Sequence, residues 1–491
     1  MNTLMPIYKP SLALLTDLYQ LTMAYGYWKL GRKDDQAVFH LTFRKHPFKG
    51  GYTIACGLEN AVAFLKAFRF DADDIQYLAG LTGNDEKPLF ERGFLDYLAA
   101  MELACDIDAV PEGTVVFPHE PLVRVKGPLL QCQLLETPLL NMINFQSLIA
   151  TKAARICSAA QGEPVLEFGL RRAQGVDGAL GASRAAYVGG CGATSNVLAG
   201  RLYGIPVKGT HAHSWVMCFD DELESFDAYA AALPNNCIFL VDTYDTLEGV
   251  RNAIEVGRRL RARGHEMLGI RLDSGDLAYL SIEARKMLDD GGFPKAFIVA
   301  SNDLDENIIA SLKQQDARIS VWAVGTRLVT AYDDPALGGV YKLSAIRRPG
   351  EDWRHKVKLS EQSIKTSTPG ILQVRRFRYD GQFMADMIFD ELKPPAAGEA
   401  TIVDMKDPTR RRIVPAGTHS EDLLTPIFRG GQCVYKGPAL VDIRRHAQEQ
   451  LTAFHNGVKR FLNPHEYPAG LEKGLHDLKT DLILSARGLP A

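Results

Sequence analysis

Polar and charged side chains follow six short apolar runs in the middle of the chain. The runs are residues 164–168, 205–208, 237–241, 267–272, 296–300 and 319–324. The segments that follow them are residues 169–172, 209–215, 242–245, 273–276, 301–303 and 325–327. If the runs are parallel strands, their carboxyl ends meet at one edge of a sheet, where α/β enzymes place their active sites. Turn and helix-cap residues explain each segment singly, but not arginines, histidines and carboxylates arriving together.

The residue types at these positions favour a substrate that carries phosphate. Arg171, Arg172 and Arg327 offer planar guanidinium groups that match the oxygens of phosphate or carboxylate. Gly325 and Thr326 permit close approach of a ligand to the backbone and offer N–H and hydroxyl donors, as barrel phosphate sites require.

Two carboxylates and two histidines complete this set. Asp273 and Asp276 could hold ribose hydroxyls or a magnesium ion that bridges phosphate oxygens. His211 and His213 follow the run at 205–208, and a neutral imidazole can act as a base or as a phosphate acceptor. His213 lies between two small residues, which leaves its ring open to a ligand, but spacing alone does not separate the two histidines.

The elements that must position these residues are alternating strands and helices. Amphipathic stretches separate most of the runs, with apolar residues on one helical face at 247, 250, 254 and 257 and at 277, 280, 284, 287 and 288. Units spaced by about thirty residues favour an α/β barrel, regular or irregular in shape. We predict three segments: an N-terminal α+β segment at 1–136, the barrel with the active site at 137–337, and a C-terminal segment at 338–491.

The outer segments are predicted to contain antiparallel sheet. Strands are expected at 37–43, 113–125, 340–346, 356–359 and 371–377, and helices at 139–160 and 443–461. The stretch 394–417 is rich in proline, glycine and charge.

Composition restricts the class of protein. The chain has 491 residues, with 56 Lys and Arg, 59 Asp and Glu, and a net charge of -3. This balance argues against a nucleic-acid or membrane-surface partner, which would call for a basic excess. The eight cysteines are scattered, so we expect reduced thiols and no zinc site. No apolar run approaches the ~20 residues that span a bilayer, and we expect a cytoplasmic protein.

Five segments resemble the nicotinate phosphoribosyltransferase family, in the family's order and across nearly the whole chain. They are LTDLYQLT at 15–22, EFGLRRAQG at 167–175, GTHAHS at 209–214, RLDSGD at 271–276 and GGVYKL at 338–343. The resemblance implies a type II phosphoribosyltransferase fold, an irregular (β/α) barrel with a flanking α+β domain built from both terminal segments. It also implies a head-to-tail homodimer with active sites shared between subunits.

The resemblance assigns roles to individual residues. Tyr19 of the neighbouring subunit and Phe168 would sandwich the pyridine ring of nicotinate, while Arg271 and Thr210 would bind its carboxylate. His213 would be phosphorylated by ATP, which couples ATP hydrolysis to nucleotide formation. The residues implied for phosphoribosyl pyrophosphate are Arg171, Asp273, Ser274, Gly325 and Thr326.

The implied reaction is the first step of NAD synthesis from nicotinate. Nicotinate, phosphoribosyl pyrophosphate and ATP would give nicotinate mononucleotide, pyrophosphate, ADP and phosphate, with Mg²⁺ as cofactor and metal ligands left open. Nicotinamide phosphoribosyltransferase is the nearest alternative, but residues 194–200 lack the carboxylate that would bind an amide. A quinolinate enzyme would call for a denser basic pocket. A catalytically silent phosphate-binding homologue is the alternative from another class.

Overall fold

The computed structural model describes residues 11–362, 366–395 and 398–490. The chain forms two compact units. Unit 1 comprises Met1–Ser147, Ala336–Ala439 and Glu449–Ala491, and unit 2 comprises Leu148–Pro335 and Leu440–Gln448. Two of the boundaries between the units fall within helices α6 (Glu136–Ala159) and α15 (Leu440–Ala453).

Unit 2 is built on a six-stranded sheet in which every pair of neighbours is parallel. Its order is β7-β6-β11-β10-β9-β8, so β7 and β8 are edges and the sheet is a curled half-barrel. The strands are β6 (Val165–Glu167), β7 (Ala193–Thr194), β8 (Ile238–Leu240), β9 (Gly269–Leu272), β10 (Phe297–Ala300) and β11 (Val321–Val324). Five of the six predicted runs are confirmed as strands. The prediction for 205–208 was wrong, because only Val207 forms a bridge there, to Thr194.

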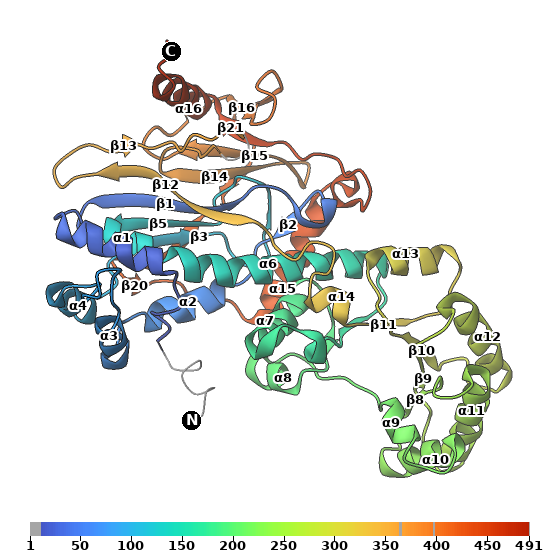
Figure 1. Ribbon diagram of the computed structural model, residues 1–491. Helices are drawn as coiled ribbons and strands as arrows, with labels where there is room; N and C mark the ends of the chain where they lie inside the picture. Colours follow the sequence, from blue (N-terminus) through green and yellow to red (C-terminus); the bar gives the residue numbers. More distant parts are fainter. Residues whose placement is uncertain (1–10, 363–365, 396–397, 491) are drawn as a thin grey trace. The chain divides into compact units, whose positions relative to one another are not determined.

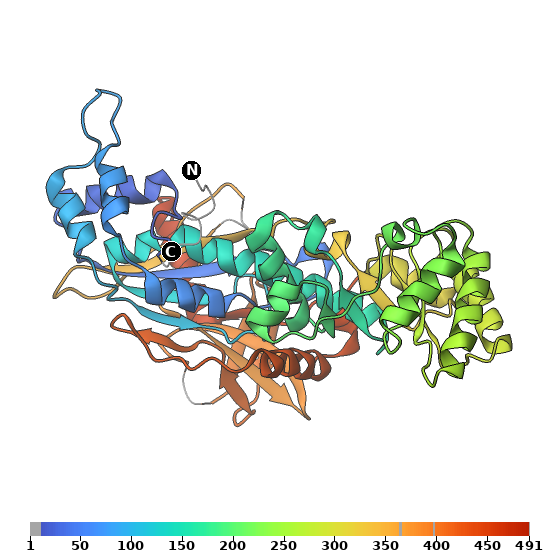
Figure 2. The same ribbon diagram turned by 90° about the horizontal axis from the view of Figure 1, so that it is seen from below.

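Helices follow most of these strands, as the amphipathic pattern predicts. They include α7 (Gly175–Val188), α8 (Val197–Tyr203), α10 (Glu222–Ala232), α11 (Thr246–Ala262), α12 (Leu277–Asp290) and α13 (Glu306–Gln314). Figure 2 shows α11 and α12, coloured green to yellow-green, side by side as they are in Figure 1. Their apolar faces turn inward: Val250 and Ile254 of α11 and Ala284 and Leu288 of α12 are buried.

Aspartates begin four of these helices. Asp221, Asp245, Asp276 and Asp305 precede α10, α11, α12 and α13, and each accepts a hydrogen bond from a backbone N–H of the first turn. Oδ1 of Asp276 accepts from the N–H of Tyr279 at 3.1 Å. The structure therefore gives Asp276 a helix-capping role, which the sequence did not separate from ligand binding.

Unit 1 contains one sheet of seven strands and another of six. One has seven strands in the order β13-β12-β1-β5-β3-β19-β20, and the other has six in the order β17-β16-β21-β15-β14-β18. The first comprises β1 (Gln36–Phe43), β3 (Asp106–Ala109), β5 (Val123–Pro128), β12 (Gly339–Arg347), β13 (Arg354–His355), β19 (Thr425–Arg429) and β20 (Gln432–Cys433). Strand β1 pairs with both β5 and β12, so both terminal segments share this sheet (Figure 1).

The second sheet of unit 1 lies entirely in the C-terminal part of the chain. It comprises β14 (Leu372–Tyr379), β15 (Gln382–Asp390), β16 (Ala400–Asp404), β17 (Arg411–Val414), β18 (Ser420–Asp422) and β21 (Ala469–Glu472). Strands β16 and β17 form an antiparallel hairpin within residues 394–417, where no strand was predicted. Short strands with exposed arginines leave little apolar pattern in the sequence from which to predict them.

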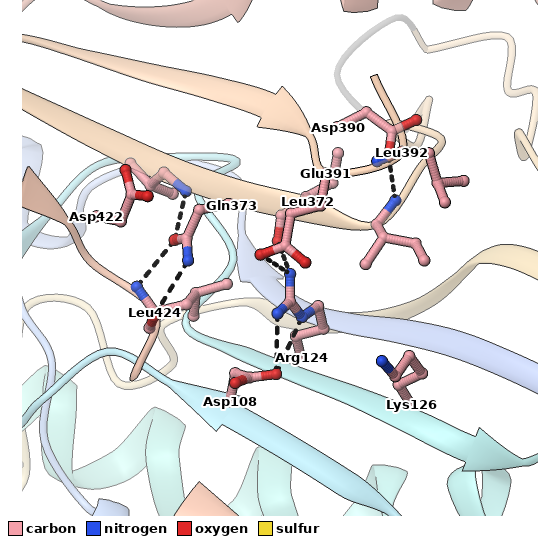
Figure 3. Close-up of polar contacts among 12 residues, drawn as sticks. Asp108, Arg124, Lys126, Leu372, Gln373, Asp390, Glu391, Leu392, Asp422 and Leu424 are labelled. Atoms are coloured by element: carbon pink, nitrogen blue, oxygen red, sulfur yellow. Dashed lines mark hydrogen bonds and ion pairs between the residues drawn. The ribbon is translucent and has the colours of Figure 1, made fainter. Parts of the chain in front are cut away.

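A buried arginine connects these two sheets, as Figure 3 shows. Arg124 of β5 donates to Oδ2 of Asp108 at 2.9 Å and to the carbonyl of Leu372 in β14 at 3.0 Å. It also pairs with Glu391 at 2.9 Å. Beside it, Gln373 donates to the carbonyl of Leu424 at 3.1 Å and accepts from its N–H at 3.0 Å. A charge buried this deeply is stable only while its partners remain in place.

The remaining elements of unit 1 differ from the predictions in detail. The predicted helix 443–461 ends at Ala453 and is followed by the short 3-10 helix η5 (Asn456–Lys459). The apolar spacing continues past the end of the helix because Phe454 and Val458 are buried as well. The predicted strand 356–359 is irregular, and helix α16 (Lys473–Ala486) was not predicted.

All eight cysteines are free, and five of them are buried. Cys218 is the exposed one. Among the helices in the described ranges, none is both long and apolar enough to traverse a bilayer.

Candidate active site

Arg271 is the centre of a polar cluster at the carboxyl end of the unit 2 sheet. It lies in β9, and its guanidinium donates from Nε to Oγ of Ser301 at 2.9 Å and from Nη1 to Oγ1 of Thr210 at 3.1 Å. Nη2 donates to Oδ1 of Asp273 at 2.8 Å. Three acceptors from three loops therefore fix the plane of the guanidinium, whose side chain is 13% exposed. Two of its five N–H groups remain for a ligand.

Asp273 is held ionised by this cluster. Burial opposes its ionisation, but the hydroxyl of Ser301 and the Arg271 guanidinium more than offset burial, so the pKa of the carboxyl lies below its usual value. Its backbone N–H donates to Oδ2 of Asp242 at 2.9 Å. At neutral pH the site thus presents a fixed carboxylate that can accept hydrogen bonds from hydroxyl groups.

His213 opens the short helix α9 (His213–Val216) and faces the same carboxylates. Its Nδ1 lies 3.2 Å from Oγ1 of Thr243, and its Nε2 lies 3.8 Å from Oδ2 of Asp273 and 3.9 Å from Oδ1 of Asp242. The His213 side chain is 39% exposed, whereas that of Asp242 is 1% exposed. Because Thr243 occupies Nδ1, the nitrogen available to a ligand is Nε2.

His211 has a different environment. Its Nε2 accepts a hydrogen bond from the N–H of Leu240 at 3.2 Å, and Phe226, Tyr229 and Phe239 surround its ring. Burial lowers the pKa of this imidazole to about 4, so it is neutral at pH 7. The geometry therefore separates the two histidines that spacing left equivalent: His211 supports β8, and His213 faces the site.

Asp242 connects the His213 and Arg271 groups. Its Oδ2 accepts from the Asp273 N–H and from Oγ of Ser274 at 2.5 Å. Its Oδ1 is buried and has no hydrogen-bond partner among the residues that the structure describes. Asp242, Thr243 and Ser301 were not selected from the sequence as site residues. They lie in the polar segments 242–245 and 301–303 that follow two of the apolar runs, but the sequence assigned no role to them.

The end of β6 forms another part of this sheet edge. The N–H of Phe168 donates to the carbonyl of Val324 at 2.8 Å, so the β6 and β11 ends are adjacent. Glu167, 1% exposed, accepts from Ser183 at 2.8 Å and from Thr194 at 2.6 Å, and also from the N–H of Gly169. The Glu167 carboxylate is thus committed to neighbouring residues and supports the backbone that carries Phe168.

Gly325 and Thr326 begin the short helix α14 (Thr326–Val329) next to β6. A Cβ on Gly325 would lie 3.2 Å from the carbonyl oxygen of Phe168. A Cβ on Gly169 would lie 2.3 Å from Cγ1 of Val329, a distance that no side chain tolerates. Glycine at 169 is therefore what lets α14 approach the end of β6.

The three arginines predicted to bind phosphate or carboxylate differ in how many contacts their side chains make. Arg327 donates to Oδ2 of Asp305 at 2.7 Å and lies over the ring of Tyr332, so its charge is partly neutralised. Arg171 and Arg172 lie in the 3-10 helix η3 (Leu170–Arg172) and are exposed. Neither has a polar side-chain contact within the described part of the chain.

The structure thus joins five of the predicted residues through direct contacts and shared partners: Thr210, His213, Arg271, Asp273 and Ser274. Phe168, Gly325 and Thr326 lie together at the adjoining strand ends. Tyr19 belongs to unit 1, where it lies on α1 (Leu18–Lys29) and is 48% exposed.

The cluster around Arg271 offers carboxylates to a metal ion, but not a complete set of protein ligands. Within the described ranges, no group of three His, Cys, Asp or Glu side chains is arranged to hold a metal. Mg²⁺ commonly binds through one or two carboxylates together with substrate phosphates and waters. The free Oδ1 of Asp242 and the ionised Asp273 fit that pattern.

Two family models match this chain, those for the N-terminal and C-terminal domains of nicotinate phosphoribosyltransferase, at residues 14–144 and 373–479. The nicotinate phosphoribosyltransferase of Bacillus subtilis is 44% identical over 94% of this chain and 93% of its own length. The chain belongs to the nicotinate phosphoribosyltransferase family. The Dictyostelium discoideum member of this family is 39% identical over 96% of this chain and 88% of its own length.

Solved structures agree with the family and the fold. The crystal structure of human nicotinic acid phosphoribosyltransferase superimposes with a TM-score of 0.83 at 34% identity, covering 95% of this chain and 99% of that one. Nicotinate-nucleotide pyrophosphorylase from Pyrococcus furiosus shares the fold, with a TM-score of 0.69 at 22% identity, over 90% of this chain and 95% of that one. The type II phosphoribosyltransferase fold expected from the sequence is confirmed.

Proposed function

We propose that this chain is a nicotinate phosphoribosyltransferase that uses ATP and Mg²⁺. It joins nicotinate to phosphoribosyl pyrophosphate and releases nicotinate mononucleotide and pyrophosphate. The observation that carries this proposal is the convergence of Arg271, Thr210, Asp273 and His213 at one sheet edge, in a chain of this family.

The nicotinate carboxylate binds Arg271 in this proposal. Two guanidinium N–H groups are left over by Ser301, Thr210 and Asp273, and a planar fork matches a carboxylate. Nicotinamide fits this arrangement less well because it has no charge to pair with Arg271. The stretch 194–200 contains no Asp or Glu that could accept a hydrogen bond from an amide. Its Asn196 is 2% exposed and already donates to Ser183 at 3.2 Å.

The pyridine ring is proposed to lie on Phe168, with Tyr19 of a second subunit on its other face. Flat aromatic rings stack favourably in this way. Support for the second part comes from the 48% exposure of Tyr19, which leaves its ring available to a partner. A homodimer with shared active sites follows from this assignment.

Phosphoribosyl pyrophosphate is proposed to lie across the strand ends. Asp273 and Ser274 accept hydrogen bonds from the ribose hydroxyls. Gly325 and Thr326 bind the 5-phosphate through backbone N–H groups, and Arg171 binds a phosphate. The pyridine nitrogen attacks C1 of the ribose as the bond from C1 to the pyrophosphate oxygen breaks. Mg²⁺ supplies charge stabilisation on the leaving pyrophosphate.

His213 is proposed as the phosphate acceptor. Nε2 attacks the γ-phosphorus of ATP, the bond to the β-phosphate oxygen breaks, and ADP leaves. Water later cleaves the phosphorus–nitrogen bond and returns phosphate. Thr243 at Nδ1 keeps the ring oriented so that Nε2 faces the site, and the Asp242 and Asp273 carboxylates stabilise the imidazolium that forms.

A radiometric or coupled assay tests this function. Purified protein given nicotinate, phosphoribosyl pyrophosphate and Mg²⁺ should form nicotinate mononucleotide, and ATP should raise the rate. His213→Ala should abolish the gain from ATP and leave slow transfer. Good turnover of nicotinamide but none of nicotinate would overturn the substrate assignment. Loss of the ATP effect in His211→Ala, with His213→Ala unaffected, would overturn the assignment of the phosphate acceptor.

A further inference from the structure

A cavity of about 520 Å³ lies within unit 1, and none of its lining residues is assigned above to a substrate. Its walls come from residues 46–51, 117–119, 402–412 and 464–469, all of which belong to unit 1. Cavities of roughly 300–1,000 Å³ are typical of small-molecule sites. The β16–β17 hairpin and the loop before β21 form much of its lining.

The lining carries an excess of positive charge. Glu466 is shared by two cations, Nζ of Lys406 at 2.9 Å and Nη1 of Arg410 at 3.5 Å. Asp404 is occupied by backbone N–H groups, which donate to its Oδ1 at 2.7 and 3.0 Å. Arg412 has no polar side-chain partner among the described residues. The charged lining residues are Lys406, Arg410, Arg411, Arg412, Asp404 and Glu466.

Two partly buried histidines add neutral hydrogen-bonding groups. Burial, with a smaller effect from Lys406, lowers the pKa of His46 to about 3. Burial likewise lowers the pKa of His119 to about 4, with smaller effects from nearby cations that include Lys406. Both rings are neutral at pH 7, so they can donate to a ligand oxygen without adding charge. His119 also has a left-handed backbone, with φ of 71°, a conformation often retained at functional sites.

Close backbone packing fixes the walls. A Cβ on Gly51 would lie 2.4 Å from the carbonyl oxygen of Val458, and a Cβ on Gly470 would lie 2.3 Å from that of Val403. Apolar surface comes from Phe117 and Tyr467, whose rings stack with centroids 4.2 Å apart. The cavity therefore combines fixed walls, an apolar side and a cationic hairpin.

We propose that this cavity binds a phosphate-bearing small molecule of nucleotide size, such as a nucleoside diphosphate. Guanidinium groups on one hairpin match phosphate oxygens, which they bind through paired charge-assisted hydrogen bonds. The aromatic and proline side of the cavity suits the less polar part of such a molecule. This site is separate in its residues from the proposed transfer reaction, because none of its lining residues contributes to the unit 2 cluster.

Calorimetric titration of the full chain with ADP tests the proposal. The cavity variant is Arg410→Ala with Arg412→Ala, and the matched control is Arg258→Ala with Arg263→Ala, which removes two exposed arginines at the surface of unit 2. The cavity variant should bind one ADP fewer per chain, or bind it at least about tenfold more weakly. The control should match the wild type. Pyrophosphate should compete with ADP at this site, and adenosine should not.

A second measurement uses the wild-type protein and so does not depend on how the variant folds. ADP should slow the modification of Arg410 and Arg412 by phenylglyoxal, followed by peptide mass mapping, and leave Arg258 unaffected. Equal ADP stoichiometry and affinity in wild type and cavity variant would overturn the proposal. So would adenosine binding as tightly as ADP, or arginine modification that ADP does not slow.

Discussion

Arg271→Lys should weaken nicotinate binding because an ammonium cannot reproduce the guanidinium contacts. Arg271 uses three N–H groups to hold Ser301, Thr210 and Asp273 and keeps two for the substrate. A lysine can donate from one nitrogen only, so it cannot both pair with Asp273 and bind a carboxylate in a fork. Loss of one charge-assisted hydrogen bond is worth about 1.5–3 kcal/mol.

This energy corresponds to a KM for nicotinate raised by roughly 10- to 150-fold, since 1.4 kcal/mol is about tenfold. Initial rates at saturating phosphoribosyl pyrophosphate and ATP, with nicotinate varied, would measure it. The KM for phosphoribosyl pyrophosphate should change less, because Asp273 and the α14 loop stay in place.

Arg285→Lys is a matched control in the same unit. Arg285 of α12 also makes several hydrogen bonds, to Asp289 at 2.9 Å and to the carbonyl of Phe293 at 2.6 Å. Phe293 precedes β10, so this arginine lies toward the amino end of the strands. Its replacement should lower thermal stability and leave the nicotinate KM unchanged. An unchanged KM in Arg271→Lys, in a protein with wild-type stability, would remove Arg271 from the carboxylate site.

Three further outcomes are expected. Gly169→Ala should raise the KM for phosphoribosyl pyrophosphate by about tenfold, since its Cβ would lie 2.3 Å from a side chain of α14 and displace that helix; unchanged initial-rate kinetics would contradict this. Glu306→Leu should lower the free energy of unfolding by about 3 kcal/mol in urea denaturation, because buried Lys152 and Arg155 each lose the Glu306 carboxylate at 2.7 Å, while Lys152 keeps Asp333 at 2.6 Å. Burial lowers the pKa of His211 to about 4 in the folded chain. Between about pH 6.5 and pH 4, His211 is therefore protonated in the unfolded chain but not in the folded chain. Wild-type stability should therefore fall in this window, and its advantage over His211→Gln should shrink by about 2.4 kcal/mol from pH 7 to pH 4.5.

Local pattern was enough to predict much of unit 2. The apolar runs at 237–241, 267–272 and 296–300 became β8, β9 and β10, and the amphipathic stretches between them became α11 and α12. These patterns are properties of contiguous residues, because burial of one face imposes a fixed period on the chain. The same reasoning overestimated 205–208 and missed β7, since a two-residue strand carries no period.

Helix α15 shows the limit of periodicity. Apolar residues continue at helical spacing from Ile443 to Val458, yet α15 ends at Ala453. Beyond the end of α15, Val458 is buried from the 3-10 helix η5 instead. Similarly, the hairpin with Arg411 and Arg412 carried too little apolar pattern to be predicted as strands.

The sequence by itself determined the family, the order of strands and helices in unit 2, and which loops carry polar residues. It did not determine the partner of each polar residue. Asp273 and Asp276 look equivalent in the sequence, but one pairs with Arg271 and the other caps α12. His211 and His213 also look equivalent in the sequence. In the structure, His211 accepts a hydrogen bond from the Leu240 N–H, whereas His213 faces Asp242. Such choices depend on strand order in the sheet, which brings together loops that lie far apart in the chain.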